Sequence, residues 1–274
     1  MAEATATPPA FGAAGAEVYE RNMGRWSRRL APLLLDFVGN EALPDGAEIL
    51  DLGCGTGSLT FALAARHPAA RITGCDIAAP LLAHACAANP APGRVGFEHG
   101  DACALPFPNG RFDQVLSSLV LMFLPDAGAA LREMRRVTRP GGLVAATTWD
   151  FRGGMPQLRL LADTAAALNP AGDAWRTRIM RGPGVLPGHL GELWRQAGFR
   201  EIRETSLAIR MEFADFADYW EPSSQSAMFG AFLRSLPPPL QADLQAKVRA
   251  AYLLGDADGP RSFTATAWAV VGRC

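Results

Sequence analysis

A glycine loop between an apolar run and a helix-like segment constrains this chain more than any other feature. Residues 47–51 have the pattern of a buried strand, Gly53, Gly55 and Gly57 follow at alternate positions, and residues 58–66 have a helical pattern. Glycines permit a tight turn and a close approach of backbone to ligand, and a helix N-terminus favours an anionic group. The loop therefore predicts a site for a nucleotide-type cofactor between a first strand and its helix.

Short apolar runs and helical patterns alternate through the middle of the chain, which is typical of βαβ units and a parallel sheet. The predicted strands are residues 47–51, 71–76, 94–99, 112–118, 143–149, 199–209 and 262–273. The predicted helices of this region are residues 58–66, 80–88, 127–137 (capped by Asp126), 155–168 and 189–197 (ended by Gly198). Arg139 to Gly142 is predicted to form a turn before the fifth strand. The sequence thus favours an α/β, doubly wound sheet.

The flanks of this alternating region have a different character. Residues 1–16 are rich in Ala, Pro and Gly, and we expect a disordered tail. Residues 17–40 repeat apolar side chains every three or four positions, which predicts a helical lid, either one helix or two broken at Pro32. Residues 151–187 and 213–261 are expected to be helical insertions, the second one interrupted at Pro222 and at residues 237–239. We expect residues 17–274 to form one domain around a core at 45–150.

Composition excludes several classes of function. Net charge is −1 with no basic stripe, so a nucleic-acid partner is not expected. Five cysteines and four histidines lie at irregular intervals without metal-ligand spacing, so no metal site is expected and the thiols should be reduced. No apolar run reaches the ~18 residues of a membrane span, and the start of the chain lacks the pattern of a secretory signal. The expected location is the cytoplasm.

Two further residues sharpen the prediction for the glycine loop. The dinucleotide pattern G-x-G-x-x-G would need a glycine at position 58, where this chain has Ser58. Asp76 ends the second predicted strand, and a carboxylate there can accept hydrogen bonds from both hydroxyls of a ribose. Together they favour an adenosine-type cofactor over NAD, and no Tyr/Lys or Ser/Tyr catalytic set supports an oxidoreductase.

Six stretches in this order resemble one family. They are Ile49–Gly57, Thr73–Ile77, Gly100–Ala102, Leu105–Pro108, Phe112–Val115 and Arg136–Gly142. On these motifs the chain resembles the class I S-adenosylmethionine (SAM)-dependent methyltransferases, in the small-molecule (type 11) group. The resemblance covers about residues 45–150. It implies a Rossmann-like, mostly parallel sheet of seven strands, the last antiparallel, and it implies SAM as cofactor and S-adenosylhomocysteine as product.

The resemblance also implies a role for each matching residue. Asp51 and the loop Gly53, Cys54, Gly55, Thr56 and Gly57 would hold the methionine part of SAM. Asp76 would bind the ribose, with Ile77 packed on the adenine. Asp101 would accept a hydrogen bond from the adenine amino group, and Ala102 would offer its backbone N–H. Ser117, Ser118 and Leu119 would border the sulfonium end.

The methyl acceptor is less legible than the cofactor. Candidates for its pocket are aromatic and methionine side chains outside the core motifs, although such residues at helical spacing also form cores. They are Tyr19, Met23, Trp26, Met122, Trp149, Tyr219 and Trp220. No His or Glu stands out as a general base, and no Asn/Asp-Pro-Pro-aromatic motif for a nucleobase amine follows the fourth strand.

The expected partner is therefore a small-molecule acceptor methylated on O, N or C, in a monomer or homodimer. A SAM-binding sensor or subunit without catalysis remains the alternative.

Overall fold

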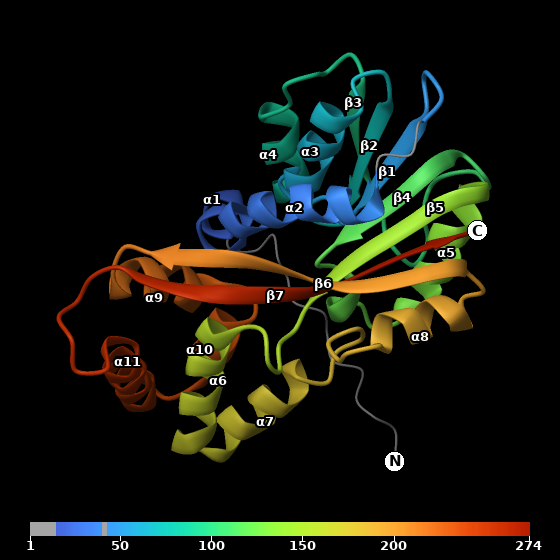
Figure 1. The fold of residues 1–274 in the computed structure, drawn as a ribbon. Helices are drawn as coiled ribbons and strands as arrows, with labels where there is room; N and C mark the ends of the chain where they lie inside the picture. Colours follow the sequence, from blue (N-terminus) through green and yellow to red (C-terminus); the bar gives the residue numbers. More distant parts are fainter. Residues whose placement is uncertain (1–14, 40–42) are drawn as a thin grey trace.

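The computed structural model describes residues 15–39 and 43–274, and its centre is a seven-stranded sheet with the order β3-β2-β1-β4-β5-β7-β6 (Figure 1). The strands are β1 (Glu48–Leu52), β2 (Arg71–Asp76), β3 (Val95–His99), β4 (Phe112–Ser118), β5 (Thr138–Trp149), β6 (Arg200–Phe213) and β7 (Arg261–Arg273). Strands β1 to β5 pair in parallel, and β7 is antiparallel to both β5 and β6. The predicted fold class, with the last strand antiparallel, is confirmed.

Helices cover both faces of the sheet. The N-terminal segment comprises α1 (Ala16–Tyr19), a π-helical turn η1 (Glu20–Gly24) and α2 (Arg25–Val38); the core helices are α3 (Ser58–Arg66), α4 (Ala79–Ala87), α5 (Ala127–Val137) and α8 (His189–Gln196). On one face α2 and α3 pack over Ile49 and Leu116, and on the other α5 and α8 pack over Leu50 and Val115. Because successive residues of β1 and β4 point to opposite faces, both faces must be apolar, which explains their near-continuous apolar runs.

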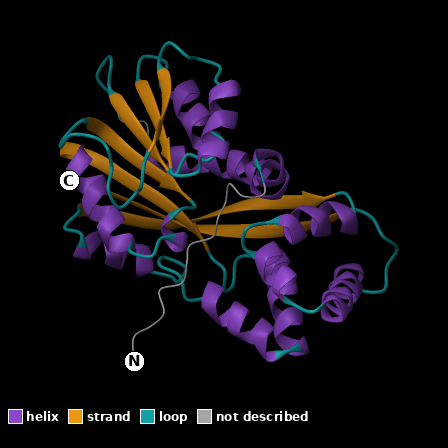
Figure 2. Cartoon of the chain, turned by 180° about the vertical axis from the view of Figure 1, so that it is seen from behind, coloured by secondary structure: helices purple, strands orange, loops and turns teal. Residues whose placement is uncertain are grey.

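A second layer of helices sits on an extension of the sheet. Strand β5 ends at Trp149, opposite Ala267, whereas β7 starts at Arg261 and pairs with β6 out to Phe213. The ends of β6 and β7 therefore project past β5 as a two-stranded ribbon (Figure 1). The helices beside it, seen from behind in Figure 2, are α6 (Pro156–Leu168), α7 (Pro170–Ile179), α9 (Phe216–Gln225), α10 (Phe229–Ser235) and α11 (Pro238–Leu253). We call this ribbon and these five helices the cap.

The structure corrects two predicted strand boundaries and adds one helix to the first insertion. Strand β6 continues to Phe213, beyond the expected end at residue 209, because apolar side chains keep alternating through Met211. Strand β5 begins at Thr138, and the expected turn at residues 139–142 is an irregularity within the strand, where the register with β4 shifts. The first insertion contains α7, which the sequence analysis did not predict; Asn169 caps it by accepting from the backbone N–H of Gly172.

Neither Pro32, where one helix or two was predicted, nor Pro222, where a break was predicted, interrupts a helix. Pro32 lies inside α2 and Pro222 lies inside α9. Each proline leaves the carbonyl four residues earlier without its helical donor. The exposed side of α2 carries Pro32, where water can satisfy that carbonyl. In α9 the freed carbonyl of Asp218 accepts from Arg25 Nη2 at 3.3 Å.

The predicted tail at residues 1–16 lies almost wholly outside the described residues, and its last residue, Ala16, begins α1. Within residues 15–39 and 43–274, no helix has the length and apolar character to cross a membrane.

Candidate functional site

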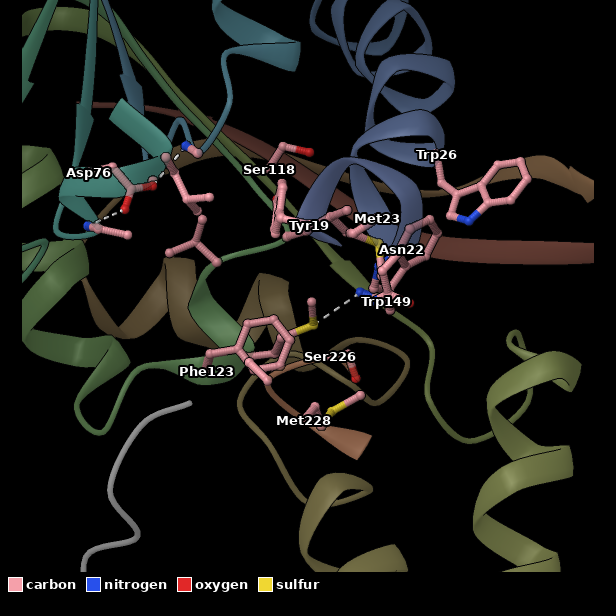
Figure 3. A pocket seen from close by; sticks show the side chains of 18 of the residues that line it. Tyr19, Asn22, Met23, Trp26, Asp76, Ser118, Phe123, Trp149, Ser226 and Met228 are labelled. Carbon is pink, nitrogen blue, oxygen red and sulfur yellow. Dashed lines mark hydrogen bonds between the residues drawn. The ribbon is translucent and has the colours of Figure 1, made fainter. Parts of the chain in front are cut away.

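A cavity of about 950 Å³ lies beyond the carboxyl ends of β1, β2 and β4. Its walls come from three parts of the chain: the loops after these strands, the N-terminal segment and the cap. Figure 3 shows Tyr19, Met23 and Trp26 entering from the N-terminal segment, with Phe123, Ser226 and Met228 across from them. In an open α/β sheet ligands bind at this edge.

The glycine loop forms the wall next to β1. Gly53 and Gly55 line the cavity, with φ of 73° and 53°, a backbone region that L side chains rarely adopt. A Cβ on Gly53 would lie 2.2 Å from a methyl of Val120, so only glycine fits there. The backbone N–H groups of Gly53 and Cys54 both donate to the carbonyl of Cys75, at 2.7 and 3.1 Å, and this ties the loop to the end of β2.

Asp76 holds a carboxylate at the cavity wall. One oxygen accepts from the N–H of Gly55 at 2.7 Å and the other from the N–H of Ala78 at 2.8 Å, as the dashed lines in Figure 3 show. Burial raises the pKa of this carboxyl, and the two backbone donors oppose that rise. Each oxygen keeps lone-pair capacity for a further donor. The adjacent Ile77 lines the cavity with its side chain 63% exposed, which leaves a flat apolar surface beside the carboxylate.

The loop after β3 adds a second polar edge. Asp101 is exposed at the cavity wall, and its carboxylate accepts from the N–H of Cys103 at 2.9 Å, in a turn closed by a bridge to Ala104. Ala102 is nearly buried beside it and also lines the cavity. The sequence analysis placed both residues at the adenine.

The end of β4 forms the wall between the glycine loop and the cap. Ser118 and Leu119 line the cavity. Leu119 has a left-handed φ of 65°, held by a hydrogen bond from its N–H to the carbonyl of Thr147 at 2.9 Å. A branched-chain residue in this region is strained and persists only where its surroundings fix it. The strain turns the chain sharply so that Val120 packs on Gly53.

Five of the residues predicted to bind cofactor lie behind the wall. They are Asp51, Cys54, Thr56, Gly57 and Ser117. Asp51 is buried and accepts from Thr60 Oγ1 at 2.6 Å; burial, more than the nearby charge of Asp76, raises its pKa to about 7. Ser117 donates to the carbonyl of Leu52 at 2.9 Å, and the hydroxyl of Thr56 bonds to Glu20 in η1. The side chains of Asp51, Thr56 and Ser117 therefore brace the loop, and none of the five residues lines the cavity.

The N-terminal segment closes the cavity from above the glycine loop. A Cβ on Gly55 would lie 3.3 Å from the Tyr19 hydroxyl, so the phenol lies directly against the loop. Burial, and then the charge of Asp76, raise the pKa of Tyr19, so the phenol stays protonated. Arg25 Nη1 bonds to both carboxylate oxygens of Asp218 in α9, at 2.8 and 3.1 Å, and its guanidinium lies 4.4 Å from the ring centre of Trp26.

The deeper wall is apolar. Among the predicted acceptor-pocket residues, Tyr19, Met23, Trp26, Met122, Trp149 and Tyr219 line the cavity, whereas Trp220 packs in the cap core against Phe216 and Phe229. The Tyr219 hydroxyl donates to the backbone carbonyl of Gln157 at 2.7 Å, and burial raises its pKa well above the ordinary value.

Sequence reasoning missed a further group of wall residues. They include Asn22, Arg25, Phe123, Phe151, Met155, Gln157, Met211, Phe213 and Met228. The alternation of Met211 and Phe213 could have been found by extending the period-two pattern of β6, since both face the same side. The others come from loops and from predicted helices whose local pattern does not show which side chains face a cavity, and the packing of the cap against the N-terminal segment brings them together. No group of three or more His, Cys, Asp or Glu side chains among the described residues could hold a metal ion.

Known proteins resemble this chain in sequence and in fold. A family model for a methyltransferase domain matches residues 50–146. Nocamycin O-methyltransferase of Saccharothrix syringae is 30% identical over 254 residues, 81% of this chain and 88% of that enzyme. Demethylmenaquinone methyltransferase of Thermus thermophilus is 43% identical over 119 residues, 43% of this chain and 51% of that enzyme, so the match spans about half its length.

Among solved structures, phosphoethanolamine N-methyltransferase 2 of Haemonchus contortus, in complex with phosphomonomethylethanolamine and S-adenosylhomocysteine, has a TM-score of 0.57 at 16% identity. The match covers 94% of this chain and 56% of that one. At this identity the likeness shows the fold alone.

Proposed function

The chain belongs to the class I SAM-dependent methyltransferases and acts on small molecules with SAM as cofactor, and from that premise we propose that it methylates an oxygen of an uncharged, largely apolar acceptor. The observation that carries the proposal is the cavity itself, which has a polar edge at the strand ends and an apolar depth between the N-terminal segment and the cap. The two halves suit two different ligands.

The polar edge fits SAM. The lone pairs left on Asp76 face the cavity and would accept from the ribose hydroxyls, and the exposed face of Ile77 would pack on the adenine. Asp101 would accept from the adenine amino group. Gly53 and Gly55 let the backbone approach the methionine part as no other residue could. When bound, SAM would supply a methyl group attached to a positively charged sulfur, and this sulfur is the leaving group when a nucleophile attacks the methyl carbon.

The chain's own contribution is position and the exclusion of water. Tyr19 closes the loop side of the cavity, and Trp26, Met122 and Trp149 surround the space toward the cap. Alignment of reactants in a site shielded from water can supply much of the rate of such a displacement. Tyr19 stays protonated because its pKa is raised. It would therefore help to position the reactants and would not act as a base.

An uncharged acceptor is supported by the charged side chains of the wall, which already form hydrogen bonds or ion pairs within the protein. Arg25, the one cationic side chain in the wall contributed by the described residues, is held by the carboxylate and the carbonyl of Asp218. At the polar edge Asp76 is held by two backbone donors and Asp101 accepts from the N–H of Cys103, while Asp126 caps α5 through the N–H of Ala129. None is placed to neutralise a phosphate or an ammonium in the deep half, where an unpaired charge would be costly.

Oxygen as the methylated atom is supported by one relative. The O-methyltransferase from Saccharothrix syringae matches 81% of this chain and 88% of its own length, whereas the menaquinone enzyme matches 43% of this chain and 51% of its own length. Since the cap supplies most of the deep wall, a relative that matches well beyond the cofactor core is the better guide to the acceptor.

The test is a screen with methyl-labelled SAM. Two sets of ring compounds of equal size would be compared: neutral phenols and enols, and their phosphorylated or aminated counterparts. We expect label in the neutral set, with mass spectrometry and NMR locating the methyl group on oxygen. Transfer confined to the charged set, or to carbon or nitrogen, would contradict the proposal. Binding of SAM without transfer to either set would favour a sensor or subunit.

A further inference from the structure

Three buried polar atoms of residues in the cavity wall have no hydrogen-bond partner among the described residues: Nε of Arg25, Nε1 of Trp149 and Oε1 of Gln157. The Arg25 guanidinium is already bound to Asp218 through its other two nitrogens, which leaves Nε1 of Trp149 and Oε1 of Gln157 in the deep half. Buried polar groups in folded proteins are nearly always paired, so an orphan in a cavity wall points to a partner that the protein itself does not provide. One of these atoms can only donate and the other can only accept.

Trp149 is fixed by its backbone and leaves its indole nitrogen unused. It is the last residue of β5, and it pairs with Ala267 of β7. Its backbone N–H, not the indole N–H, donates to the sulfur of Met122 at 3.3 Å. Its side chain is 1% exposed, and Figure 3 shows it deep between the N-terminal segment and Met228. The indole nitrogen is the one polar atom of this side chain, and no described residue pairs with it.

Gln157 is an amide in an otherwise apolar wall. It lies in the first turn of α6, is 6% exposed, and its Nε2 donates to the sulfur of Met211 at 2.9 Å. A thioether sulfur is an acceptor, so this contact fixes which end of the amide is the nitrogen and leaves the oxygen unpaired. The backbone carbonyl of Gln157 is used by the Tyr219 hydroxyl, so only the side-chain oxygen is unused.

We infer that Trp149 Nε1 and Gln157 Oε1 recognise the acceptor, and that the acceptor is an apolar ring compound carrying a carbonyl together with a hydroxyl. The indole N–H donates to the carbonyl, and the hydroxyl donates to the amide oxygen. Both atoms are now covered, so the ligand reaches them after a side-chain rotation. This inference rests on the proposed function and narrows its acceptor from an uncharged apolar molecule to a hydroxy-ketone.

Binding of four ring compounds of similar size, each with S-adenosylhomocysteine present, tests the inference. They are naphthalene, 1-tetralone, 5-hydroxy-1-tetralone and 1-naphthyl phosphate. We expect the hydroxy-ketone to bind at least about tenfold more tightly than naphthalene, with tetralone between them, because each buried hydrogen bond is worth about three- to tenfold in affinity. Equal affinity for naphthalene and the hydroxy-ketone would overturn the inference and leave the proposed function intact.

Three variants assign the preference to atoms. Trp149→Phe should remove most of the advantage of tetralone over naphthalene, and Gln157→Met should remove the further advantage of the hydroxyl. Trp175→Phe is the matched control, because Trp175 Nε1 is also buried and unpaired but the residue does not line the cavity. Affinity for S-adenosylhomocysteine should be unchanged in all three, which shows that the cofactor half is folded.

The possible results distinguish failure of this inference from failure of the proposed function. If Trp149→Phe and Gln157→Met keep the wild-type order of affinities, these atoms do not read the acceptor and the inference fails. If the wild-type protein prefers 1-naphthyl phosphate, the proposed function fails with it.

Discussion

At the scale of single residues, Asp76 is the most firmly oriented polar group of the proposed SAM site. Its two oxygens are each held by one backbone donor, so the carboxylate is oriented before any ligand arrives. Orientation in advance means that little conformational freedom is lost when the ribose binds. Burial raises the pKa of this carboxyl, so the same environment that orients the group also makes its charge costly when unpaired.

Replacing Asp76 with Ala should weaken SAM binding by about 5- to 150-fold, because the ribose hydroxyls lose their acceptor at a cost of about 1–3 kcal/mol. Isothermal titration calorimetry with SAM measures the effect. Glu98→Ala is a suitable control, since Glu98 is an exposed carboxylate on the neighbouring strand β3. If Asp76→Ala binds SAM as the wild type does, the ribose lies elsewhere.

At the scale of elements, side chains of the N-terminal segment attach it to the glycine loop on one side of the cavity and to α9 of the cap on the other. Its π-helical turn allows Glu20 to fold back against Gly24 and reach the Thr56 hydroxyl in the glycine loop, while Arg28 pairs with the same carboxylate. One turn further on, Arg25 reaches across to α9. The carbonyl of Asp218 is open to Arg25 because Pro222 has no N–H to donate to it. The proline thus creates a docking point and does not end the helix.

Arg25→Met should loosen this closure. The methionine keeps much of the apolar packing on Trp26 and Phe213 but loses the bonds to Asp218. Hydrogen exchange of residues 16–24 should become severalfold faster, and KM for the acceptor should rise more than the affinity for SAM falls.

The matched control for Arg25→Met lies one turn along the same helix. Arg29 pairs with Glu212 at 2.9 Å on the exposed side, where such pairs contribute little, so Arg29→Met should leave exchange near the wild-type rate. Equal exchange in both variants would show that the Arg25 pair does not hold the segment closed.

At the scale of the whole molecule, the cavity exists because the sheet is longer on one side. The ribbon of β6 and β7 extends beyond β5 and carries the cap, and Met211 and Phe213 on the ribbon face the cavity. The glycine loop and the cap therefore meet across a space that neither could enclose alone. Behind the loop, a buried Asp51 adds a cost to the folded state that depends on pH.

Stability without ligand should fall as pH rises from about 4 to about 7. The pKa of Asp51 is about 7 in the folded protein and 3.8 unperturbed, so the folded state binds the extra proton in this window. The slope from one group is at most about 1.4 kcal/mol per pH unit, and Asp76, also raised, acts in the same direction. Asp51→Asn keeps an acceptor for Thr60 and should flatten the dependence.

Thermal unfolding between pH 5 and pH 8 measures this effect, at about 2–4 °C per kcal/mol for a chain of this size. Asp36→Asn, which alters an exposed carboxylate paired with Arg66, should keep the wild-type slope. Identical slopes for the wild type and Asp51→Asn would show that Asp51 is ionised throughout and that its surroundings stabilise the charge.

Local sequence patterns were enough to predict the core sheet and the strand ends at which we propose that SAM binds. Strands β2 and β4 and helix α3 lie at the predicted residues, and Asp76 ends its strand as expected, because local periodicity, turn glycines and short connections decide these features. Eight of the predicted cofactor residues line the cavity, and five lie behind it as braces. A pattern along the chain gives the order of residues in a loop but not which of them face outward.

The proposed acceptor pocket, by contrast, depends on tertiary packing. Its wall includes Trp149 from the end of β5, Gln157 from the start of α6 and Met211 from the ribbon. The packing of the cap brings these three elements to one cavity. Trp220, predicted on the same grounds of residue type, does not line this cavity and packs against Phe216 and Phe229. An aromatic or methionine side chain gains the same free energy by burial in a core as at a cavity wall. The choice between the two therefore depends on how the elements pack around the side chain, and its own sequence neighbourhood carries no record of that packing.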